Sequence, residues 1–526
     1  MRLRSPGFMF YAVAPSEHAY ARMEDVPPHI SDAIPWFIIL IVIELLVSVM
    51  QGVVHRRHNV KDMFCSVSLG LFQQIASIPF AAMASSVYAS AYEHCRLFTV
   101  PYDSALAWWG LMLGVDLGYY ALHRWCHEFH LGWIGHSCHH SGEFYNLATA
   151  LRQGTLQSLA SSFFYLPLAL LGLPLPMFMT HKALNLLYQF WIHTETIGDL
   201  GPLEYILNTP SHHRLHHRPG ANVNYAGVLI IWDRMFGTFR AEGEGQLDRY
   251  GLGKPLNTFD PVRANFEYIR RASESIGWVR PMLPWRRRLA PKWSFRPLDV
   301  FRPLEYEASG ERRRDADRRS NAIRGRGRPA LWYRPALWAP PDENAARQKY
   351  VGSMPPFRHR GAIEASYLGA HLLVLLVGHH CFEELMRQPG STSDPATYAL
   401  ALWLLASLCA LGRLSDGDAS GVRLEWVRLA LLAPTLLLVS QRLGGGEPAG
   451  GAGGSGELMI VAVALLACAV WSLVGSGWWL EEPTEKAAKL VGRPQQLPQR
   501  DHTSQQTSAR RGRRSLRSPS PKSRRV

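Results

Sequence analysis

Long blocks of apolar residues constrain the fold of this 526-residue chain more than any other feature. The first block reads IPWFIILIVIELLVSVMQGVV from Ile34 to Val54 and contains one carboxylate, Glu44. At about 1.5 Å per residue, a helix of this length crosses a hydrocarbon core of about 30 Å. Eight further blocks are similar, namely Cys65–Tyr92, Ser104–Leu122, Thr155–Met179, His181–His193, Ala365–Phe382, Ala396–Leu411, Leu424–Ser440 and Leu458–Leu480. Because nine such blocks in one soluble protein are improbable, the sequence predicts an all-α, polytopic membrane helical bundle.

The composition excludes several other classes of protein. With 17 Trp, 21 Phe and 19 Tyr, the chain has enough large apolar side chains to rule out disorder throughout. The seven cysteines are an odd number and include no CxxC pair, which excludes a zinc finger and a disulfide scaffold. The remaining function classes are those of a membrane protein.

Basic residues gather in three segments that predict the orientation of the chain. They are His55–Lys61, Arg249–Arg360 and Arg510–Val526, and the second holds more than twice as many Lys and Arg as Asp and Glu residues. Basic loops stay in the cytosol, so we expect all three segments there and the N-terminus in the lumen. The charge surrounds no aromatic platform, so we expect contact with solvent or anionic lipid and no nucleic-acid partner.

These patterns divide the chain into five predicted regions. They are an N-terminal segment (1–33), a membrane hydroxylase domain with the histidine clusters (34–265), a basic cytosolic linker (266–364), a C-terminal four-helix membrane region (365–482) and a disordered basic tail (483–526).

Histidines form the strongest functional signal in the chain. Of the 22 histidines, twelve fall between His123 and His217. One HxxxH and two HxxHH motifs account for most of them: His123 and His127; His136, His139 and His140; His213, His216 and His217. On a helix, positions i, i+3 and i+4 share a face, so each motif would direct its imidazoles toward one point. Imidazoles that converge without paired carboxylates indicate metal ligation.

The number and position of these imidazoles predict two ions at one membrane boundary. Eight or nine ligands suit two ions, and imidazole suits iron, zinc or copper, with iron the natural choice for dioxygen chemistry. The first motif ends the third apolar block, and Thr155–His193 can cross and return as a hairpin. His193 would then join the three motifs on the cytosolic face. The alternative, a histidine-rich surface loop, suits a single HxxxH motif better than three converging ones.

Other histidines and the nearby carboxylates have less certain roles. His371 and the pair His379 and His380 lack matching spacing and are interpreted as core or interfacial residues, whereas His130, His181 and His212 stay undecided. Asp116 lies about two helical turns before His123 and can orient a ligand imidazole, or else lie near water at a helix end. Glu128 would point about 100° away from His127 along a helix, which favours a cofactor contact over ligation. Glu44 is interpreted as structural.

The three histidine motifs resemble those of the membrane fatty acid hydroxylase and sterol desaturase superfamily. Longer stretches, dense from about residue 10 to residue 265, are similar to the narrower family of alkylglycerol monooxygenases. They include GVDLGYYALHRWCHE (Gly114–Glu128), GHSCHHSGEFYNLATALRQ (Gly135–Gln153), NLLYQFWIHTE (Asn185–Glu195), LGPLEYILNTPSHHRLHH (Leu200–His217) and NYAGVLIIWDRMFGTF (Asn224–Phe239).

This resemblance implies a di-iron, tetrahydrobiopterin-dependent monooxygenase of the endoplasmic reticulum membrane, with its active site facing the cytosol. It would use dioxygen to hydroxylate the ether-linked carbon of an alkylglycerol, releasing a fatty aldehyde and a glycerol derivative, and a separate reductase would recycle the pterin. The implied metal ligands are His123, His127, His136, His139, His140, His193, His213, His216 and His217. Glu128 would influence the pterin, and Asp116 and Asn208 are the implied catalytic positions, ahead of Glu143, Tyr145, Asn146 and Arg152 as weaker candidates.

Two alternatives stay open at this point. The same scaffold serves sterol or fatty-acyl hydroxylation and desaturation, from which dependence on pterin would distinguish the present chain. A membrane metal-binding or transport protein is the alternative of another class. A transporter needs polar groups along a path through the bilayer, whereas these histidines gather at one face.

Overall fold

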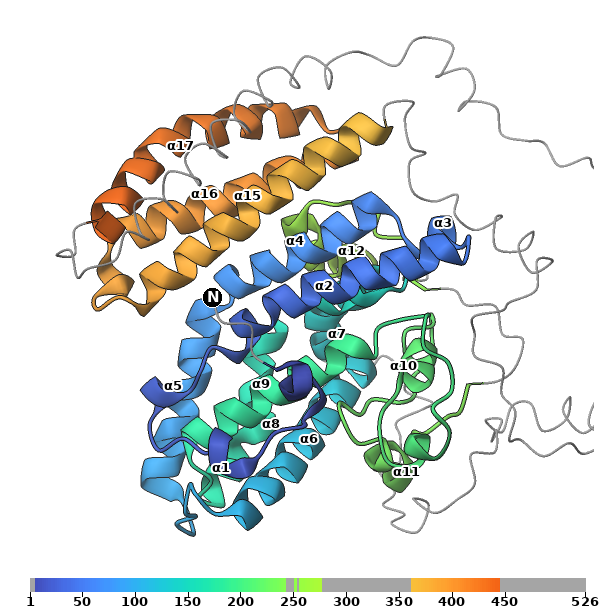
Figure 1. Cartoon of the computed structure of the whole chain (residues 1–526), viewed down its shortest axis with the longest axis vertical. Coiled ribbons are helices and arrows are strands. Elements are labelled where there is room, and N and C mark those ends of the chain that lie inside the picture. Colours follow the sequence, from blue (N-terminus) through green and yellow to red (C-terminus); the bar gives the residue numbers. More distant parts are fainter. Residues whose placement is uncertain (1–4, 243–249, 253–254, 277–360, 445–526) are drawn as a thin grey trace, which may run out of the picture. The chain divides into compact units, whose positions relative to one another are not determined.

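A computed structural model describes residues 5–242, 250–252, 255–276 and 361–444 of the chain. Within these ranges the regular secondary structure is helical, and an isolated antiparallel β-bridge joins Leu207 and Leu229. The prediction of an all-α fold is therefore confirmed for the described part of the chain (Figure 1).

Six long helices build the part of the fold that carries the histidines. They are α2 (His29–Met50), α4 (Val60–Ala76), α5 (Ile78–Cys95), α6 (Ala105–Glu128), α8 (Gln157–Leu170) and α9 (Leu175–Trp191). Helix α6 packs against α8 and α9, α2 packs against α9, and α5 packs against α8. The apolar core shared by α2, α5, α6, α8 and α9 includes Phe37, Trp108, Met177 and Phe190, whereas the buried apolar residues of α4 belong to two other clusters. These helices form the frame from which the histidine-bearing segments extend, and α6 itself carries His123 and His127.

Shorter helices connect this frame and carry most of the histidines. Near the N-terminus they are η1 (Pro6–Phe10), α1 (Pro15–His18), η2 (Met23–Asp25) and α3 (Val54–Arg57). Around the histidines they are α7 (His130–His136), η3 (His139–Ser141), η4 (Leu147–Leu151), η5 (Gly201–Tyr205), α10 (Pro210–His216), α11 (Ile231–Phe236) and α12 (Pro261–Ile276).

Local sequence signals explain where the long helices begin and break. The Asn59 side chain accepts hydrogen bonds from the backbone N–H groups of Lys61 and Asp62, at 3.0 and 3.2 Å, and so caps the start of α4. Helix α4 ends at Ala76, and α5 begins two residues later with Pro79 in its first turn, at an angle of 54° to α4. Proline has no backbone N–H and cannot continue a helical hydrogen-bond ladder, which accounts for the break.

Fewer helices pass the length and hydropathy test for a membrane span than the nine blocks suggest. Among the described helices three pass, Met23–Met50, Ala365–Arg387 and Pro395–Asp416, and the bent pair of α4 and α5 is a fourth candidate if it counts as one span. Helices α8 and α9, with 14 and 17 residues, reach only about 21 and 26 Å. Each is therefore too short for a core of about 30 Å.

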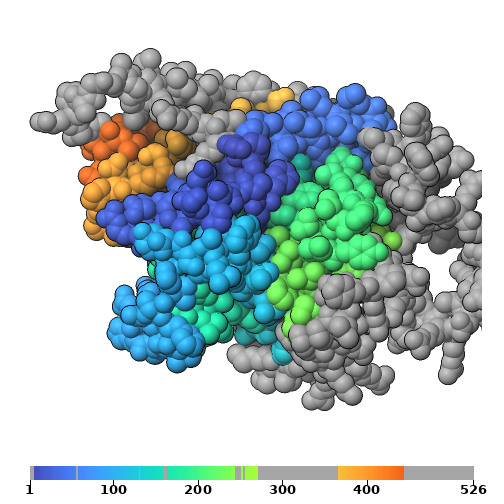
Figure 2. Space-filling model, turned by 60° about the horizontal axis from the view of Figure 1, so that its bottom comes forward, coloured from blue at the N-terminus to red at the C-terminus, as the bar shows by residue number. Residues whose placement is uncertain are grey.

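Three helices follow in the C-terminal part of the described chain: α15 (Gly361–Arg387), α16 (Pro395–Asp416) and α17 (Ala419–Gly444). Helices α15 and α16 pack against α4 through a second apolar cluster. On the face shown in Figure 2, the C-terminal helices (yellow to orange) lie beside the N-terminal segment (dark blue). Arg413 of α16 donates a hydrogen bond of 2.7 Å to Asp260, and Lys61 of α4 donates one of 3.2 Å to the carbonyl of Ser415. The C-terminal helices are thus tied directly to the histidine-bearing part.

Several predicted regions fall on residues that the structure does not describe. The basic linker 266–364 lies mostly outside the described residues, and the apolar block Leu458–Leu480 and the tail 483–526 lie entirely outside them. Helix α12 runs across the predicted boundary at residue 265. The division into five regions stays a prediction.

Candidate metal centre

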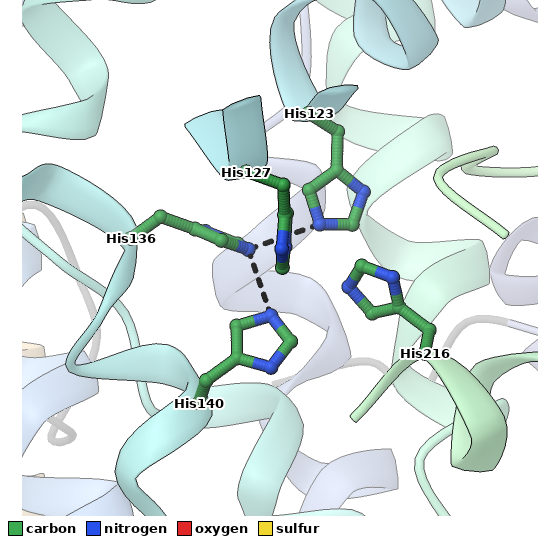
Figure 3. A group of neighbouring side chains, drawn as sticks. All are labelled: His123, His127, His136, His140 and His216. Atoms are coloured by element: carbon green, nitrogen blue, oxygen red, sulfur yellow. Dashed lines mark hydrogen bonds between the residues drawn. The ribbon is translucent and has the colours of Figure 1, made fainter. Parts of the chain in front are cut away.

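Nine buried histidines form two groups whose ring nitrogens converge. Within each group, one nitrogen from every residue lies within 4.8 Å of the others. Figure 3 shows the rings of the first group pointing toward a common centre. The first group contains His123, His127, His136, His140 and His216, and the second contains His139, His193, His213 and His217. The structure thus brings together all nine histidines singled out in the sequence, as two sets suited to two ions.

Each HxxHH motif contributes to both groups. His136 and His140, at positions i and i+4, belong to the first group, whereas His139 between them belongs to the second. The other motif divides in the opposite way, since His213 and His217 belong to the second group and His216 to the first. The two groups are therefore adjacent, and the rings of His140 and His217 stack with centroids 4.3 Å apart.

Acceptors behind the rings determine which ring nitrogen carries the proton. Five of the nine histidines place Nδ1 within 2.6–2.9 Å of an oxygen, which favours protonated Nδ1 and leaves the Nε2 lone pair facing the centre. The pairs are His123 with the Tyr225 carbonyl, His136 with Gln157 Oε1, His139 with the Arg152 carbonyl, His193 with the Gln189 carbonyl and His216 with the Val223 carbonyl.

The spacing of the inward nitrogens fits metal ligation better than hydrogen bonding. Nε2 of His136 lies 2.9 Å from Nε2 of His123 and 3.1 Å from Nε2 of His140 (Figure 3). If His123 and His136 both carry their proton on Nδ1, neither Nε2 can donate to the other. Two imidazole nitrogens bound at about 2.1 Å to one ion, at right angles, would lie about 3.0 Å apart. The residues present therefore fit a cation.

Two further observations agree with this interpretation. Within the described part of the chain, the buried Nε2 of His216 has no hydrogen-bond partner, as expected for an atom whose partner is an ion. Burial lowers the pKa of His139 to about 4, and burial, reinforced by neighbouring imidazoles, lowers the pKa values of His140 and His217 well below 6.5. The rings are thus neutral at pH 7, the state that ligates metal.

Asp116 organises a loop next to the histidines. Its carboxylate is completely buried and accepts hydrogen bonds from the Asn185 side chain at 2.7 Å and the Trp232 indole at 2.9 Å. It also accepts bonds from the backbone N–H groups of Val228 and Leu229, at 2.8 and 2.9 Å. This loop follows Tyr225, whose carbonyl is the acceptor for His123. Asp116 therefore acts on His123 through the loop.

Asn208 stabilises the same loop from the opposite side. Its side-chain amide donates to the Ala226 carbonyl at 2.6 Å, and its backbone N–H donates to the Val228 carbonyl at 2.7 Å. A Cβ atom at Gly227 would lie 2.9 Å from the Asp116 carboxylate, so the close approach requires glycine. The two predicted catalytic positions thus meet at one loop behind the first histidine group.

Glu128 lies at the end of α6, directly after His127. Its carboxylate accepts a hydrogen bond of 2.7 Å from the Arg124 side chain, which in turn donates to the Tyr120 hydroxyl at 3.1 Å. Among the weaker candidates, Arg152 is buried and pairs with Asp62 at 2.6 Å. The Glu128 side chain is 13% exposed, although its Oε2 atom is buried, and the ion pair with Arg124 holds it beside His127.

Sequence reasoning missed the oxygens that orient the rings. Four of the five acceptors are backbone carbonyls, which every residue has, so no residue type marks them. Gln157 is the only side chain among these five acceptors. Glu44, interpreted as structural, accepts a hydrogen bond of 2.9 Å from the backbone N–H of Leu147 and another from the Thr194 hydroxyl, next to His193.

Comparisons with known proteins agree with this geometry. Human alkylglycerol monooxygenase is 48% identical over 271 residues, covering 50% of this chain and 60% of the human protein. The Xenopus tropicalis alkylglycerol monooxygenase is 46% identical over 49% of this chain and 58% of its own length. The ornithine lipid hydroxylase OlsE of Rhizobium tropici is 34% identical over 25% of this chain and 40% of its own length.

The chain thus spans about 60% of the length of the alkylglycerol monooxygenases that it matches. No solved structure gives a significant match. The family model described as fatty acid hydroxylase matches residues 108–238, the segment that holds all nine converging histidines. The resemblance to the fatty acid hydroxylase family, predicted from the histidine motifs, is therefore confirmed for residues 108–238.

Proposed function

We propose that this chain is a tetrahydrobiopterin-dependent di-iron monooxygenase that cleaves the ether bond of alkylglycerols. The observation that carries the proposal is the presence of two buried groups of imidazoles, one of five histidines and one of four. Both groups lie within the residues that match the fatty acid hydroxylase family. The high identity to alkylglycerol monooxygenases supports the substrate class. Iron bound by these imidazoles would supply the oxidising power that acid–base chemistry lacks.

The proposed reaction balances with dioxygen and a reduced pterin. One oxygen atom enters the C–H bond next to the ether oxygen, the other leaves as water, and the pterin supplies the two electrons. The resulting hemiacetal breaks its bond to the glycerol oxygen, which receives the hydroxyl proton, and a fatty aldehyde is released.

The residues of the chain would hold and shield this chemistry. His123, His136 and His216 are kept in one tautomer by the oxygens behind them, so their Nε2 lone pairs face the centre. All nine rings are buried, with side chains at most 5% exposed, which excludes bulk water from the reacting atoms. The loop held by Asp116 and Asn208 positions one of these acceptors.

Membrane location follows from the same proposal. The lipid substrate explains candidate spans around the site, and the polar pterin explains a site that faces the cytosol. We place the protein in the endoplasmic reticulum membrane, where a separate reductase would return the oxidised pterin to its reduced form.

The direct test is to incubate membranes that contain the protein with hexadecylglycerol, with and without tetrahydrobiopterin, and to measure fatty aldehyde. We expect aldehyde only when the pterin is present. Turnover of a sterol or fatty-acyl substrate without pterin, and none of the alkylglycerol, would favour the other reactions of this scaffold.

Glu128 gives a prediction for the pterin. The variant Glu128→Ala is expected to raise the apparent KM for tetrahydrobiopterin by about tenfold, because a charge-assisted contact contributes about 1.5–3 kcal/mol, with a smaller change in the KM for alkylglycerol. Steady-state rates over a pterin titration measure both constants.

The variant Glu128→Gln is the control for this prediction, since it keeps a hydrogen-bond acceptor for Arg124 but removes the charge. An unchanged pterin KM in both variants would remove Glu128 from the pterin site.

A further inference from the structure

A large apolar cavity opens beside the second histidine group. It has a volume of about 730 Å³ and is lined at one end by His193 with Gln157 and Gln189. Gln157 and the Gln189 carbonyl are also acceptors for ligand-candidate imidazoles, so the cavity reaches the acceptors of both histidine groups. Its size is that of a ligand pocket, in the range of about 300–1,000 Å³.

One face of helix α15 forms a wall of this cavity. The lining residues of α15 recur every three or four positions and are Leu368, Gly369, Leu372, Leu373, Leu376 and His379. This spacing places them in one stripe along the helix. Since α15 lies beyond residues 108–238, the match to the hydroxylase family says nothing about this wall.

Contacts of α2 indicate the length of the cavity. Residues of α2 line it from Ile30 to Leu45. Near the C-terminal end of α2, Glu44 accepts a hydrogen bond from Thr194, the residue after His193. Near the N-terminal end of α2, Ser31 donates a hydrogen bond of 2.5 Å to Glu383 of α15. Ser31 and Glu44 are 13 positions apart along α2, which is about 20 Å of helix. One leaflet of a bilayer has a hydrocarbon depth of about 15 Å, so the cavity can take a membrane-lipid chain.

The end of the cavity far from the histidine groups is polar. His379 lines it there, and its Nδ1 lies 3.8 Å from the Glu383 carboxylate. An alkyl chain that reached His379 and Glu383 would place these polar side chains in an apolar environment, which costs free energy. The apolar wall therefore has a definite end, one turn before Glu383.

We propose that this cavity holds the alkyl chain of the substrate and that α15, through Leu376 and His379, sets the longest chain accepted. The identity of the head group rests on the proposed function. The ether carbon would lie by the histidines, and the chain would extend along the α15 stripe toward His379. Helix α15 would then be a specificity-determining part of the enzyme, although it lies in the region that the sequence predicted only as membrane helices.

The test compares Leu376→Trp with Val377→Trp in the full-length protein. Leu376 lines the cavity, whereas Val377 is the next residue, does not line it and is 38% exposed. Binding of dodecyl-, hexadecyl- and eicosylglycerol is measured by competition in lipid nanodiscs, together with the KM for cleavage. Each buried methylene contributes about fourfold in affinity, so excluding two or three weakens binding at least tenfold.

We expect Leu376→Trp to weaken eicosylglycerol at least tenfold relative to dodecylglycerol, while Val377→Trp keeps the wild-type profile. Equal chain-length profiles in Leu376→Trp and wild type would overturn the proposal. A wild-type protein that binds the series with chain-length dependence but never cleaves it would instead contradict the proposed function and leave the cavity assignment standing.

A second variant keeps the proposal testable if Leu376→Trp does not fold. Gly369 lines the cavity, and a Cβ atom there meets nothing within 4 Å, so Gly369→Leu fills open space. Glycine inside a helix is also unfavourable, so this change suits α15. We expect Gly369→Leu to bind all three alkylglycerols more weakly than the wild-type protein does. The matched control is Gly110→Leu, because Gly110 lies inside α6, outside the cavity, and a Cβ atom there also meets nothing within 4 Å. This variant should bind the alkylglycerols as wild type does. Wild-type affinity in Gly369→Leu would contradict the proposal.

Discussion

Alanine at His139 or at His140 is expected to abolish turnover, while each variant keeps about half of the wild-type metal. The two residues are neighbours in sequence, but His139 belongs to the four-histidine group and His140 to the five-histidine group. Loss of one ligand lowers the metal affinity of the site to which it belongs far more than that of the other site. Since changing an outer-shell partner alone costs about 10–100-fold, loss of a ligand should lower the rate by more than about 100-fold. His136→Ala and His216→Ala should behave as His140→Ala does.

Metal analysis of the purified variants, with aldehyde formation as the activity measurement, checks this result. The control is His371→Ala, because His371 is a buried histidine in α15 that lies outside both groups and contacts the Tyr367 carbonyl. It should keep the wild-type metal content. Near-normal turnover in any ligand variant, or full metal content in both His139→Ala and His140→Ala, would contradict the assignment of two separate sites.

Replacing Asp116 with alanine is expected to produce the largest loss of stability among the variants considered. Three buried donors, from Asn185, Val228 and Leu229, and the partly buried indole N–H of Trp232 would lose their acceptor. A buried donor that is left without an acceptor costs about 1–3 kcal/mol, and several such costs add here. The loop behind His123 would then loosen, and metal content and activity would fall together with the melting temperature.

The variant Asp116→Asn separates positioning from catalysis, because it keeps one acceptor oxygen while removing the charge. We expect it to recover part of the melting temperature and of the metal content, and to recover activity in proportion. A stable Asp116→Asn protein with full metal content and no turnover would show instead that the carboxylate takes part in the reaction directly.

The histidine motifs were sufficient to name the ligand candidates. Helical spacing puts i, i+3 and i+4 on one face, so His136, His139 and His140 could be expected to converge without any tertiary information. The assignment of His139 to a different group from its neighbours could not be expected in the same way. It depends on His193 and His213, which approach from α9 and α10.

The roles of the carboxylates also needed the folded chain. Asp116 lies two helical turns before His123, which suggested a direct contact with an imidazole. In the structure its bonds go to Asn185, Trp232 and the Val228–Leu229 backbone, because the loop after Tyr225 comes between them. Sequence distance along one helix cannot show which segment packs into the space beside it.

By itself, the sequence determined the helical class, the membrane setting and the nine converging histidines, because these depend on local periodicity and residue type. Only the tertiary structure decided how the histidines divide between two sites, which oxygens hold their tautomers, and that α15 borders a cavity beside them. These features arise where separate segments of the chain meet, and the cavity joins segments far apart in sequence, such as those of His193 and Leu376. Such meetings are set by the packing of whole helices, which leaves no mark at any single position of the chain.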